Sequence, residues 1–417
     1  MESNRSSRTT KTTSNDPVGL AQMGLIGWDP IEPIVVAALA ARLPVMFVGY
    51  HGTTKTDGTS VLSRSALGDA EARFVSYLTP MTTLEDMIGF VDPSSLASGQ
   101  VRYVRTGTSV WGAAAVLMDE INRANPMTVS KFMELVRTGQ VLGTDTGVQH
   151  VFGACNPTRG YRTSYLDLAF ASRWVIVEVP GMSRLTDQHV DDILEAGTFT
   201  VRVEFAARLA GIRARLRDQR RTDTPLDKSL RLLVRQVLRK LHESGLKNLN
   251  VQVRQGVNML SLLRHYCADC ELLGVAPRQS DMTDIVMACI PEVQGVCEAQ
   301  VAGSDVAKII KPLTLAVQHP GVLDEPTSIQ QLIETVATRD KNAWGAQAIQ
   351  LIGKTKIPIQ DLHRFSQVLR RLLLDGEIAA TVFNEVYGRM VAVPGFLADD
   401  TPIGWDRSGL IGAIRNT

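Results

Sequence analysis

The sequence predicts an α/β fold in which helices flank a parallel sheet, and two runs of residues carry that prediction. The run from 113 to 125 reads AAAVLMDEINRAN, where six apolar residues stop at Asp119 and Glu120. Apolar residues without alternation are typical of a strand buried on both faces of a parallel sheet. The run from 44 to 56 reads PVMFVGYHGTTKT, a second apolar strand that enters a loop rich in glycine and threonine.

The loop after the second strand is close to the phosphate-binding pattern G-x-x-x-x-G-K-[ST], with Thr54 where the second glycine is expected. That chemistry requires inward-facing backbone N–H groups, a lysine on the outer phosphates and a hydroxyl on Mg²⁺. The residues expected to bind a nucleotide are therefore Gly49, His51, Gly52, Thr53, Thr54, Lys55 and Thr56. The alternative is an ordinary turn between strand and helix. Gly58 makes a poor start for the expected helix, because glycine there costs about 1 kcal/mol relative to alanine.

The acidic pair ends its strand where open α/β sheets bind ligands, in the crevice beyond the carboxyl ends of the strands. A buried pair of carboxylates is unfavourable unless a cation or a reaction requires it. In nucleotide chemistry, Asp119 would orient Mg²⁺ and Glu120 would act on water. The alternative is that both residues are acids at the start of a helix, where they favour the helix dipole.

Two further segments have polar residues at strand ends. The run from 151 to 157 reads VFGACNP and ends on Asn156, whose amide could hold an attacking water. The run from 164 to 174 reads SYLDLAFASRW, a short helix that places Arg173 before the strand from 175 to 179. An arginine there could stabilise charge on a transferred phosphoryl group, including one in a neighbouring subunit. The alternatives are an Asn-Pro turn and a surface arginine at a helix end.

The order of these motifs resembles the MoxR family of AAA+ ATPases over about residues 20 to 300. The resemblance is carried by MDEINRANPMTVSKFMELVRTGQV, then ACNPT and LDLAFASRW. The pair Arg173-Trp174 departs from the family's usual aspartate, arginine and phenylalanine. The segments 74–92 and 100–111 are similar to the family's second strand and its extra hairpin. The fold implied is an AAA+ P-loop parallel sheet flanked by helices, an all-α lid and a mainly helical C-terminal domain.

The resemblance also implies ATP and Mg²⁺ as cofactors and a role for each polar residue. Lys55 and Thr56 would bind the phosphates and Mg²⁺, Asp119 would orient the metal, and Glu120 would polarise water. Asn156 would be the first sensor and Arg254 the second, reaching the γ-phosphate in its own subunit. Arg173 would be the arginine that acts in trans, and the nearby alternatives for that role are Arg123, Arg159, Arg162 and Arg184.

Composition agrees with a globular protein of two or three domains. The chain has 417 residues, of which 44% are hydrophobic and 21% charged, and its net charge is +1. That charge predicts no general attraction to nucleic acid or membrane. The basic run 213–240 is better explained by a solvated helix face than by a nucleic-acid surface. No apolar segment approaches the roughly 18 residues of a membrane span, and the polar N-terminus lacks a secretion signal.

The cysteines indicate a reducing compartment more than a metal site. Cys267 and Cys270 form a CxxC beside His265, but a matching second CxxC is missing and the surrounding pattern is helical. We therefore expect reduced, partly buried thiols and a cytoplasmic protein.

The predicted organisation has four parts. Residues 1–18 form a disordered tail, 19–185 the nucleotide-binding α/β domain opened by a helix at 31–42, and 186–300 a helical lid. Residues 301–417 form a helical domain for partner or oligomer contacts. Its expected helices are 329–337, 344–352, 359–374 and 378–391, with breaks at Pro312, Pro320, Pro326 and Pro358.

The predicted function is ATP hydrolysis at the subunit interfaces of a ring, which by resemblance has six subunits and remodels or activates a client protein. The client could be a protein with a von Willebrand A domain. One alternative is a nucleic-acid motor, for which Arg102, Tyr103, Arg105 and Trp111 in the hairpin are a hint. Another is a nucleotide-binding scaffold with little turnover, which Thr54 and Gly58 leave open.

Overall fold

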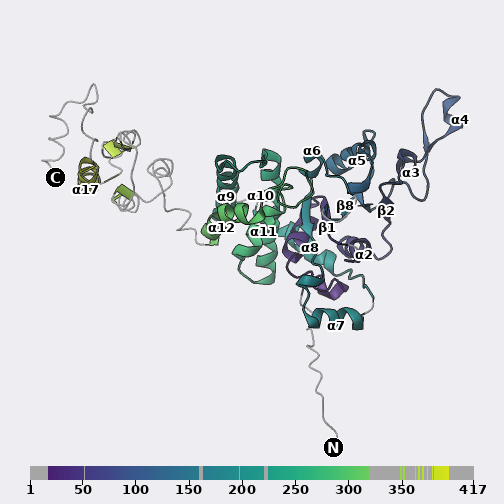
Figure 1. Cartoon of the computed structure of the whole chain (residues 1–417), viewed down its shortest axis with the longest axis horizontal. Helices are drawn as coiled ribbons and strands as arrows, with labels where there is room; N and C mark the ends of the chain where they lie inside the picture. Colours follow the sequence, from purple (N-terminus) through teal and green to yellow (C-terminus); the bar gives the residue numbers. More distant parts are fainter. Residues whose placement is uncertain are drawn as a thin grey trace, which may run out of the picture. The chain divides into compact units, whose positions relative to one another are not determined.

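The computed structural model describes residues 17–50, 52–158, 163–196, 198–219 and 224–318, and further along 348–349, 351–352, 362, 365–366, 369–370, 373, 378 and 380–393. The chain divides into two compact units, residues 1–318 and 319–417. Figure 1 shows the course of the chain.

The first unit is built on a five-stranded parallel sheet. Its strands are β1 (Val45–Val48), β2 (Phe74–Leu78), β5 (Ala115–Asp119), β8 (His150–Cys155) and β9 (Val175–Glu178), in the order β2-β5-β8-β1-β9. The two apolar runs of the sequence form β5 and β1, and both strands are buried. The predicted α/β fold, a parallel sheet flanked by helices, is confirmed.

Helices cover both faces of this sheet because alternate strand residues point to opposite sides. On one face, Met46, Val116 and Ile176 pack in a core with Phe132 of α5 (Pro126–Thr138) and with residues around α6 (Leu168–Ala171). On the other face, Phe47 lies against Trp28 with ring centroids 5.2 Å apart. The helices α1 (Glu32–Ala41) and α2 (Lys55–Leu67) belong to that side, and α1 is the helix expected at 31–42.

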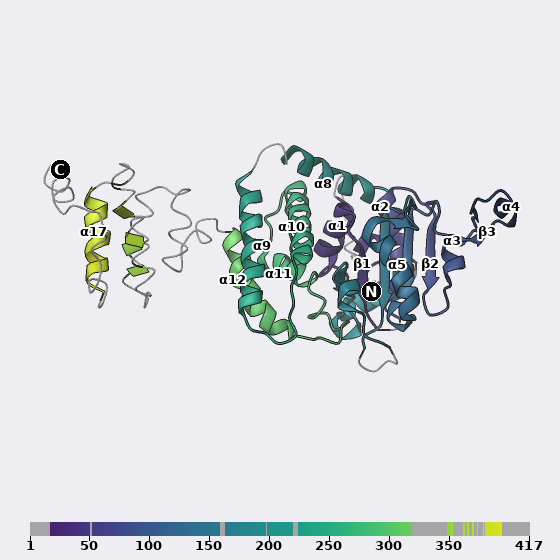
Figure 2. The same ribbon diagram turned by 90° about the horizontal axis from the view of Figure 1, so that it is seen from above.

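A hairpin inserted between β2 and β5 extends away from the sheet in Figures 1 and 2. It contains α3 (Leu84–Ile88), β3 (Phe90–Val91), α4 (Pro93–Leu96) and β4 (Tyr103–Val104), and β3 pairs antiparallel with β4. Phe90 and Tyr103 are exposed, whereas Trp111 is buried and its indole donates to the Ile88 carbonyl at 2.8 Å. Trp111 therefore anchors the base of the hairpin and is not one of its exposed aromatic residues.

A second, smaller hairpin follows α5. Its strands β6 (Gln140–Val141) and β7 (Thr144–Asp145) are joined by a turn whose backbone N–H groups at Leu142 and Gly143 both donate to Glu134, each at 2.8 Å. The glutamate of the Phe132-Met133-Glu134 motif therefore holds this turn against α5.

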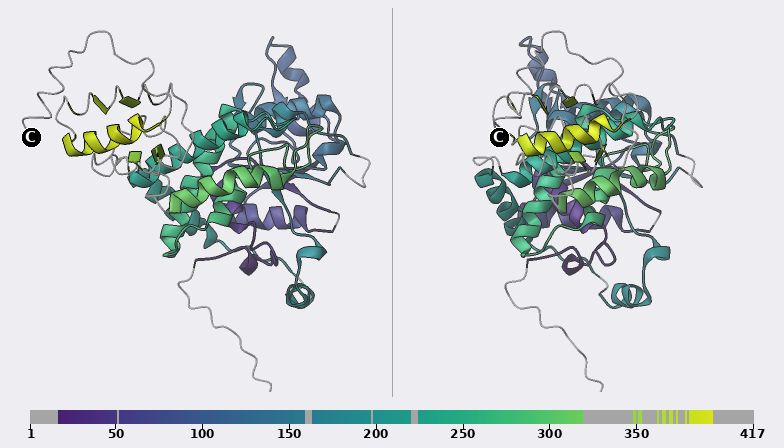
Figure 3. Two further views of the ribbon diagram at one scale, coloured as in Figure 1. Left: turned by 60° about the vertical axis from the view of Figure 1, so that its left-hand side comes forward. Right: turned by 90° about the vertical axis from the view of Figure 1, so that its left-hand side faces the viewer.

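The sheet is followed by the helices α7 (Asp187–Ala196), α8 (Phe205–Gln219), α9 (Pro225–Glu243), α10 (Val253–Leu273), α11 (Gln279–Met287) and α12 (Gly303–Gln318). The helices α8 to α12 form a layer beside the α/β part (Figures 2 and 3), whereas α7 lies apart from α9 to α12 in Figure 1. Three short 3₁₀ helices, Ala21–Met23, Ile121–Arg123 and Met182–Arg184, lie in the connections. α10 packs on both α1 and α8, so the helical layer is joined directly to the α/β part.

A buried ion network ties the helical layer to α1. Arg208 of α8 donates to both carboxylate oxygens of Asp269 of α10, at 2.9 and 2.7 Å, and to Glu32 of α1 at 2.7 Å. Although burial disfavours the charged guanidinium, Asp269 and then Glu32 raise the pKa of Arg208 above its ordinary value. These three residues fix the relative position of three helices.

One predicted helix break is wrong. Pro312 lies inside α12, where it removes a backbone hydrogen bond but does not end the helix. Packing of α12 against α9 and α11 holds the helix together across that position. α12 belongs to the first unit, which continues beyond the predicted end of the lid at residue 300.

The second unit has its own apolar core, in which Phe365 and Leu369 pack with Phe383, Val386 and Met390. Its helix α17 (Ala380–Val391) matches the helix expected at 378–391. The helix expected at 329–337 and the breaks at Pro320, Pro326 and Pro358 lie outside the described residues, as does nearly all of the predicted N-terminal tail. The helices expected at 344–352 and 359–374 lie only partly within them. No helix in the described ranges is long and apolar enough to cross a membrane.

Candidate functional site

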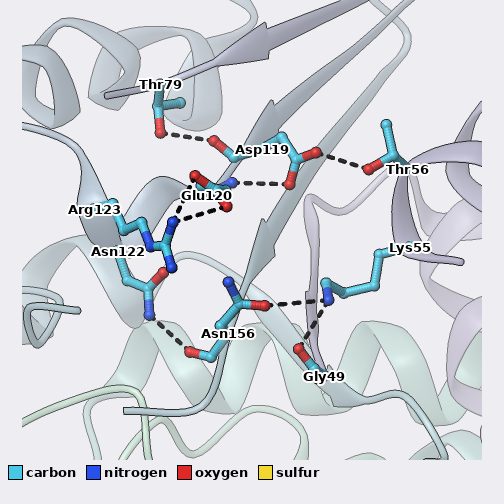
Figure 4. A network of polar contacts seen from close by, with 9 residues as sticks. All are labelled: Gly49, Lys55, Thr56, Thr79, Asp119, Glu120, Asn122, Arg123 and Asn156. Carbon is cyan, nitrogen blue, oxygen red and sulfur yellow. Dashed lines mark hydrogen bonds and ion pairs between the residues drawn. The ribbon is translucent and has the colours of Figure 1, made fainter. Parts of the chain in front are cut away.

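The predicted polar residues converge at the carboxyl edge of the sheet (Figure 4). β8 lies between β1 and β5. The glycine loop after β1 and the acidic pair at the end of β5 therefore lie on either side of the end of β8. Neighbouring strands are about 4.8 Å apart, which leaves roughly 10 Å between the ends of β1 and β5 for a ligand. Lys55, Thr56, Asp119 and Asn156 all face that space.

Lys55 is the first residue of α2, and its ammonium group points back into the loop. It donates to the carbonyls of Gly49 at 2.8 Å and Tyr50 at 2.9 Å, and it lies 3.4 Å from Asn156 Oδ1. Burial lowers the pKa of Lys55, and the negative charge of Asp119 acts in the opposite direction. Because neutral carbonyls hold the Lys55 ammonium group beside Asp119, its positive charge can also bind an anionic ligand such as phosphate. His51, also predicted in this loop, lies outside the described residues.

Asp119 is held on two sides at the end of β5. Its Oδ2 accepts from the Thr56 hydroxyl at 2.7 Å, and its Oδ1 accepts from the Glu120 backbone N–H at 2.9 Å. Thr79 donates to the Asp119 carbonyl with both its backbone N–H and its hydroxyl, at 3.0 and 2.8 Å. A hydroxyl beside a single fixed carboxylate fits Mg²⁺, which in proteins takes one or two carboxylates and completes its shell with phosphates and water.

Glu120 follows with a left-handed backbone, at a φ of 52°. This conformation is unfavourable for a residue with a side chain, and such strain is concentrated at functional sites. Both of its carboxylate oxygens accept from Arg123 at 3.2 Å, and the side chain stays partly exposed beside Asp119. The acidic pair therefore divides into a fixed, inward carboxylate and an outer carboxylate that solvent reaches.

Asn156 is nearly fully buried at the end of β8, directly between the loop and the acids. Asn122, which was not predicted as a site residue, donates to the Asn156 carbonyl at 2.7 Å and so fixes the backbone that carries the amide. Asn122 is buried as well. Its place in the run DEINRA was visible in the sequence, but nothing in the spacing distinguishes a positioning amide from a helix-start residue.

The predicted arginines lie elsewhere. Arg173 precedes β9, and the register pairs Val45 with Val175, so Arg173 leaves the sheet at the edge opposite to Lys55. Burial, followed by the positive charges of Arg254 and Arg137, lowers the pKa of Arg173. The Nε of Arg173 is a buried donor that has no partner among the described residues, and its Nη1 donates to the Ala169 carbonyl.

The other arginines considered for the trans role differ in their surroundings. Arg123 is paired with Glu120, and Arg184 is paired with Glu178 at 3.0 Å on the surface. Arg159 and Arg162 lie outside the described residues.

The structure explains why position 58 is a glycine, which the sequence alone does not. A Cβ at this position in the first turn of α2 would lie 2.8 Å from Leu25 Cδ2, closer than real Cβ contacts. Glycine therefore allows the segment before α1 to pack on the first turn of the helix that carries Lys55 and Thr56.

The five cysteines are free and buried, and Cys267 and Cys270 lie within α10. Burial raises the pKa of Cys267 to about 12 and that of Cys270 to about 11. In the part of the chain that the structure describes, no group of three or more His, Cys, Asp or Glu residues has the arrangement of a metal site.

Thr54 stands where the phosphate-binding pattern has its second glycine, and its backbone conformation leads to a testable prediction. It has a φ of 56°, the left-handed conformation that the second glycine of the pattern would adopt freely. A left-handed backbone costs roughly 1–2 kcal/mol for residues other than glycine. Glycine avoids this cost, but it loses more conformational entropy on folding, and that loss offsets part of the gain. We expect Thr54→Gly to raise the free energy of unfolding by roughly 0.5–1 kcal/mol in urea denaturation. Thr53→Gly, at a position without a left-handed φ, should lower it, and equal effects of both substitutions would contradict the interpretation.

No protein-family model and no curated protein matches the chain. Among solved structures, it is similar to a Cytophaga hutchinsonii protein described as a candidate ATPase, at 15% identity and a TM-score of 0.49, over 70% of this chain and 92% of that one. It is also similar to the active helicase Cch of SCCmec type IV, at 11% identity and a TM-score of 0.36, over 92% of this chain and 64% of that one. The order of the five parallel strands and the helices on both faces of the sheet define the fold.

Proposed function

We propose that the chain binds ATP with Mg²⁺ at the carboxyl edge of the sheet and hydrolyses it. The observation that carries this proposal is the hydrogen bond of 2.7 Å between Thr56 and Asp119, which joins the start of α2 to the end of β5. It brings a metal-binding hydroxyl and carboxylate together beside a lysine held within a glycine loop. Phosphate binding at such a loop also benefits from the positive end of the helix dipole of α2.

Each residue has a distinct task in this proposal. When bound, ATP supplies the transferred phosphoryl group and Mg²⁺ neutralises its charge. Lys55 binds the outer phosphates, and Thr56 and Asp119 hold the metal. Glu120 accepts a proton from the attacking water, and Asn156 orients that water through its amide.

We further propose that Arg173 acts on a nucleotide bound by a neighbouring subunit. Lys55 and Arg173 leave parallel, in-register strands at opposite edges, so Arg173 is badly placed for its own loop. Its buried Nε has no hydrogen-bond partner among the described residues, and the positive charges of Arg254 and Arg137 act on its guanidinium group. A bound anion would relieve the repulsion among these charges. Arg254 would reach the γ-phosphate of the nucleotide in its own subunit, as the family resemblance implies.

This organisation would make the protein a MoxR-like ATPase that works as a ring, with six subunits by family resemblance. ATP turnover would drive the remodelling or activation of a client protein. The client, which could carry a von Willebrand A domain, would contact the exposed side chains of the β3–β4 hairpin, including Phe90 and Val104.

Mixing two inactive variants tests the trans arrangement. Arg173→Ala keeps its loop but lacks the arginine, and Lys55→Ala keeps the arginine but lacks the loop lysine. Each alone should have at least about tenfold lower ATP turnover than the wild type, because each removes a charge that stabilises the transition state. An equimolar mixture should regain part of the activity, since some interfaces then combine an intact loop with an intact arginine.

The matched control is Arg239→Ala, which removes an exposed arginine of α9 and should leave turnover unchanged. If the mixture stays as inactive as its components, Arg173 acts within its own subunit or has no role in hydrolysis.

The alternative is a nucleic-acid motor, which the hairpin favours because exposed Phe90 and Tyr103 lie beside Arg102 and Arg105. Bases stack on exposed aromatic side chains, and arginines contact the phosphate backbone. Adding single-stranded DNA to the same turnover assay separates the two candidates. Stimulation that Arg102→Ala abolishes would favour the motor.

A further inference from the structure

A second, strongly basic cavity lies away from the loop that carries Lys55. It has a volume of about 430 Å³ and is lined by Arg42, Ala210, Arg213, Leu216, Arg217 and His265. These residues come from the end of α1, from α8 and from α10, three helices that pack against one another (Figure 2). None of the lining residues is acidic.

The hydrogen bonds that the structure describes for Arg213 and Arg42 go to neutral groups. Arg213 donates to the carbonyls of Ala40 at 3.0 Å and Leu39 at 3.3 Å, and Arg42 donates to the Gln149 side chain at 3.3 Å. Among the residues that the structure describes, none of the three guanidinium groups forms an ion pair. Arg215, on the same helix as Arg213, is paired with Glu271, and Arg208 with Glu32 and Asp269. The cavity arginines therefore differ from their neighbours on α8.

The excess charge affects nearby groups. Burial, and then Arg42, lowers the pKa of Arg213. Burial lowers the pKa of His150 to about 3, with Arg213 and Arg42 adding to the shift, so this histidine stays neutral beside the arginines. The basic run that begins at Arg213 has the pattern of a solvated helix face, but Arg213 is half-buried and lines this cavity.

Arg42 is also strained. It follows α1 with a φ of 55°, a left-handed position at which glycine is the usual residue. Glu120 and Thr54 share this strain at the carboxyl edge of the sheet. Strained backbone that carries a charged side chain points to a role for that side chain beyond packing.

The cavity is separate from the glycine loop and from Arg254. Arg42 lies three residues before β1 and Lys55 follows the loop after it, so they lie at opposite ends of that strand. His265 is eleven residues beyond Arg254 on α10, a rise of about 16 Å along the helix.

We propose that this cavity binds a small, multiply charged phosphate-bearing ligand. Arginine presents a planar set of donors that matches phosphate oxygens, and cavities of 300 to about 1,000 Å³ hold small molecules. The arginines converge from two elements onto one cavity, whereas a nucleic-acid backbone is normally followed by a stripe of basic residues. A ligand here would bridge α1 of the α/β part to α8 and α10 of the helical layer. This site does not depend on the proposed ATPase activity.

Calorimetric titration of the full chain with inorganic pyrophosphate tests the proposal. The titration is made in the Lys55→Ala background, so that pyrophosphate in the glycine loop does not contribute. We expect saturable binding of one pyrophosphate per chain. Arg213→Ala and Arg217→Glu, each added to that background, should weaken it at least about tenfold, as each removes a charged hydrogen-bond donor.

Arg217→Glu keeps the test decisive if Arg213→Ala destabilises α1, because the Arg217 side chain is exposed. The matched control is Arg239→Glu on α9, which changes the net charge equally and should leave the affinity unchanged. Absence of saturable binding would overturn the proposal. Equal weakening by Arg239→Glu would overturn it too, as would binding of a single-stranded oligonucleotide in preference to pyrophosphate.

Discussion

Glu120→Gln is expected to lower the rate of ATP hydrolysis by a factor of about 10²–10⁴ while leaving the affinity for Mg²⁺-ATP within about twofold. Glutamine preserves the shape of the side chain and can still contact Arg123, but it cannot accept a proton from water. Asp119, Thr56 and Lys55, which would hold the metal and the phosphates, are not altered. The measurement is steady-state phosphate release together with equilibrium binding of a fluorescent ATP analogue.

A control for Glu120→Gln is Glu243→Gln, which removes a carboxylate from the exposed pair with Lys240 at the end of α9. It should change neither turnover nor affinity. Wild-type turnover in Glu120→Gln would show that Glu120 is not the base, and a large loss of affinity would show that it binds the nucleotide instead.

Arg208→Ala is expected to destabilise the first unit by about 3–5 kcal/mol, because it leaves two carboxylates buried without their cation. Arg208 and Asp269 are both almost fully buried, and Glu32 completes the network from α1. Chemical denaturation followed by tryptophan fluorescence would measure the loss as a lower transition midpoint.

The matched control is Arg215→Ala, on the same helix and paired with Glu271 at 3.1 Å on the surface. Exposed ion pairs contribute about 0–1 kcal/mol, so this variant should stay close to the wild type. If Arg208→Ala is no more destabilising than Arg215→Ala, the network does not hold the helical layer to α1.

The sheet and its acidic end were predictable because their signals are local. Apolar runs without alternation specified β1 and β5, and the spacing of Gly49, Gly52 and Lys55 specified the loop between β1 and α2. Asn156 was also predictable, because it follows a short apolar run. Each of these predictions needs only the physics of one strand and the turn that follows it.

Contacts between distant segments were not predictable. Gly58 is unfavourable for a helix by its own propensity, but the absence of a side chain there makes room for Leu25. Asn122 supports Asn156 through a hydrogen bond across 34 positions, and Arg208 reaches Glu32 across 176. Pro312 suggested a break, but tertiary packing keeps α12 continuous. Single-sequence patterns contain no information on which distant side chains meet.

The arginines illustrate the same limit at the proposed site. Arg173 and Arg254 stand apart in sequence and were assigned to different phosphates by family resemblance. The structure places Arg173 at the edge of the sheet away from Lys55, and the positive charges of Arg254 and Arg137 act on it. This position could only be found once β9 was placed in space.

The central claim is that Lys55, Thr56, Asp119 and Glu120 form a site that hydrolyses ATP with Mg²⁺. The most direct test is phosphate release by the purified full chain, with Mg²⁺ and with the metal removed by a chelator, for the wild type and for Lys55→Ala. We predict turnover by the wild type that depends on Mg²⁺ and is lost in Lys55→Ala. Mg²⁺-ATP binding without turnover in the wild type, or turnover that Lys55→Ala retains, would contradict the claim.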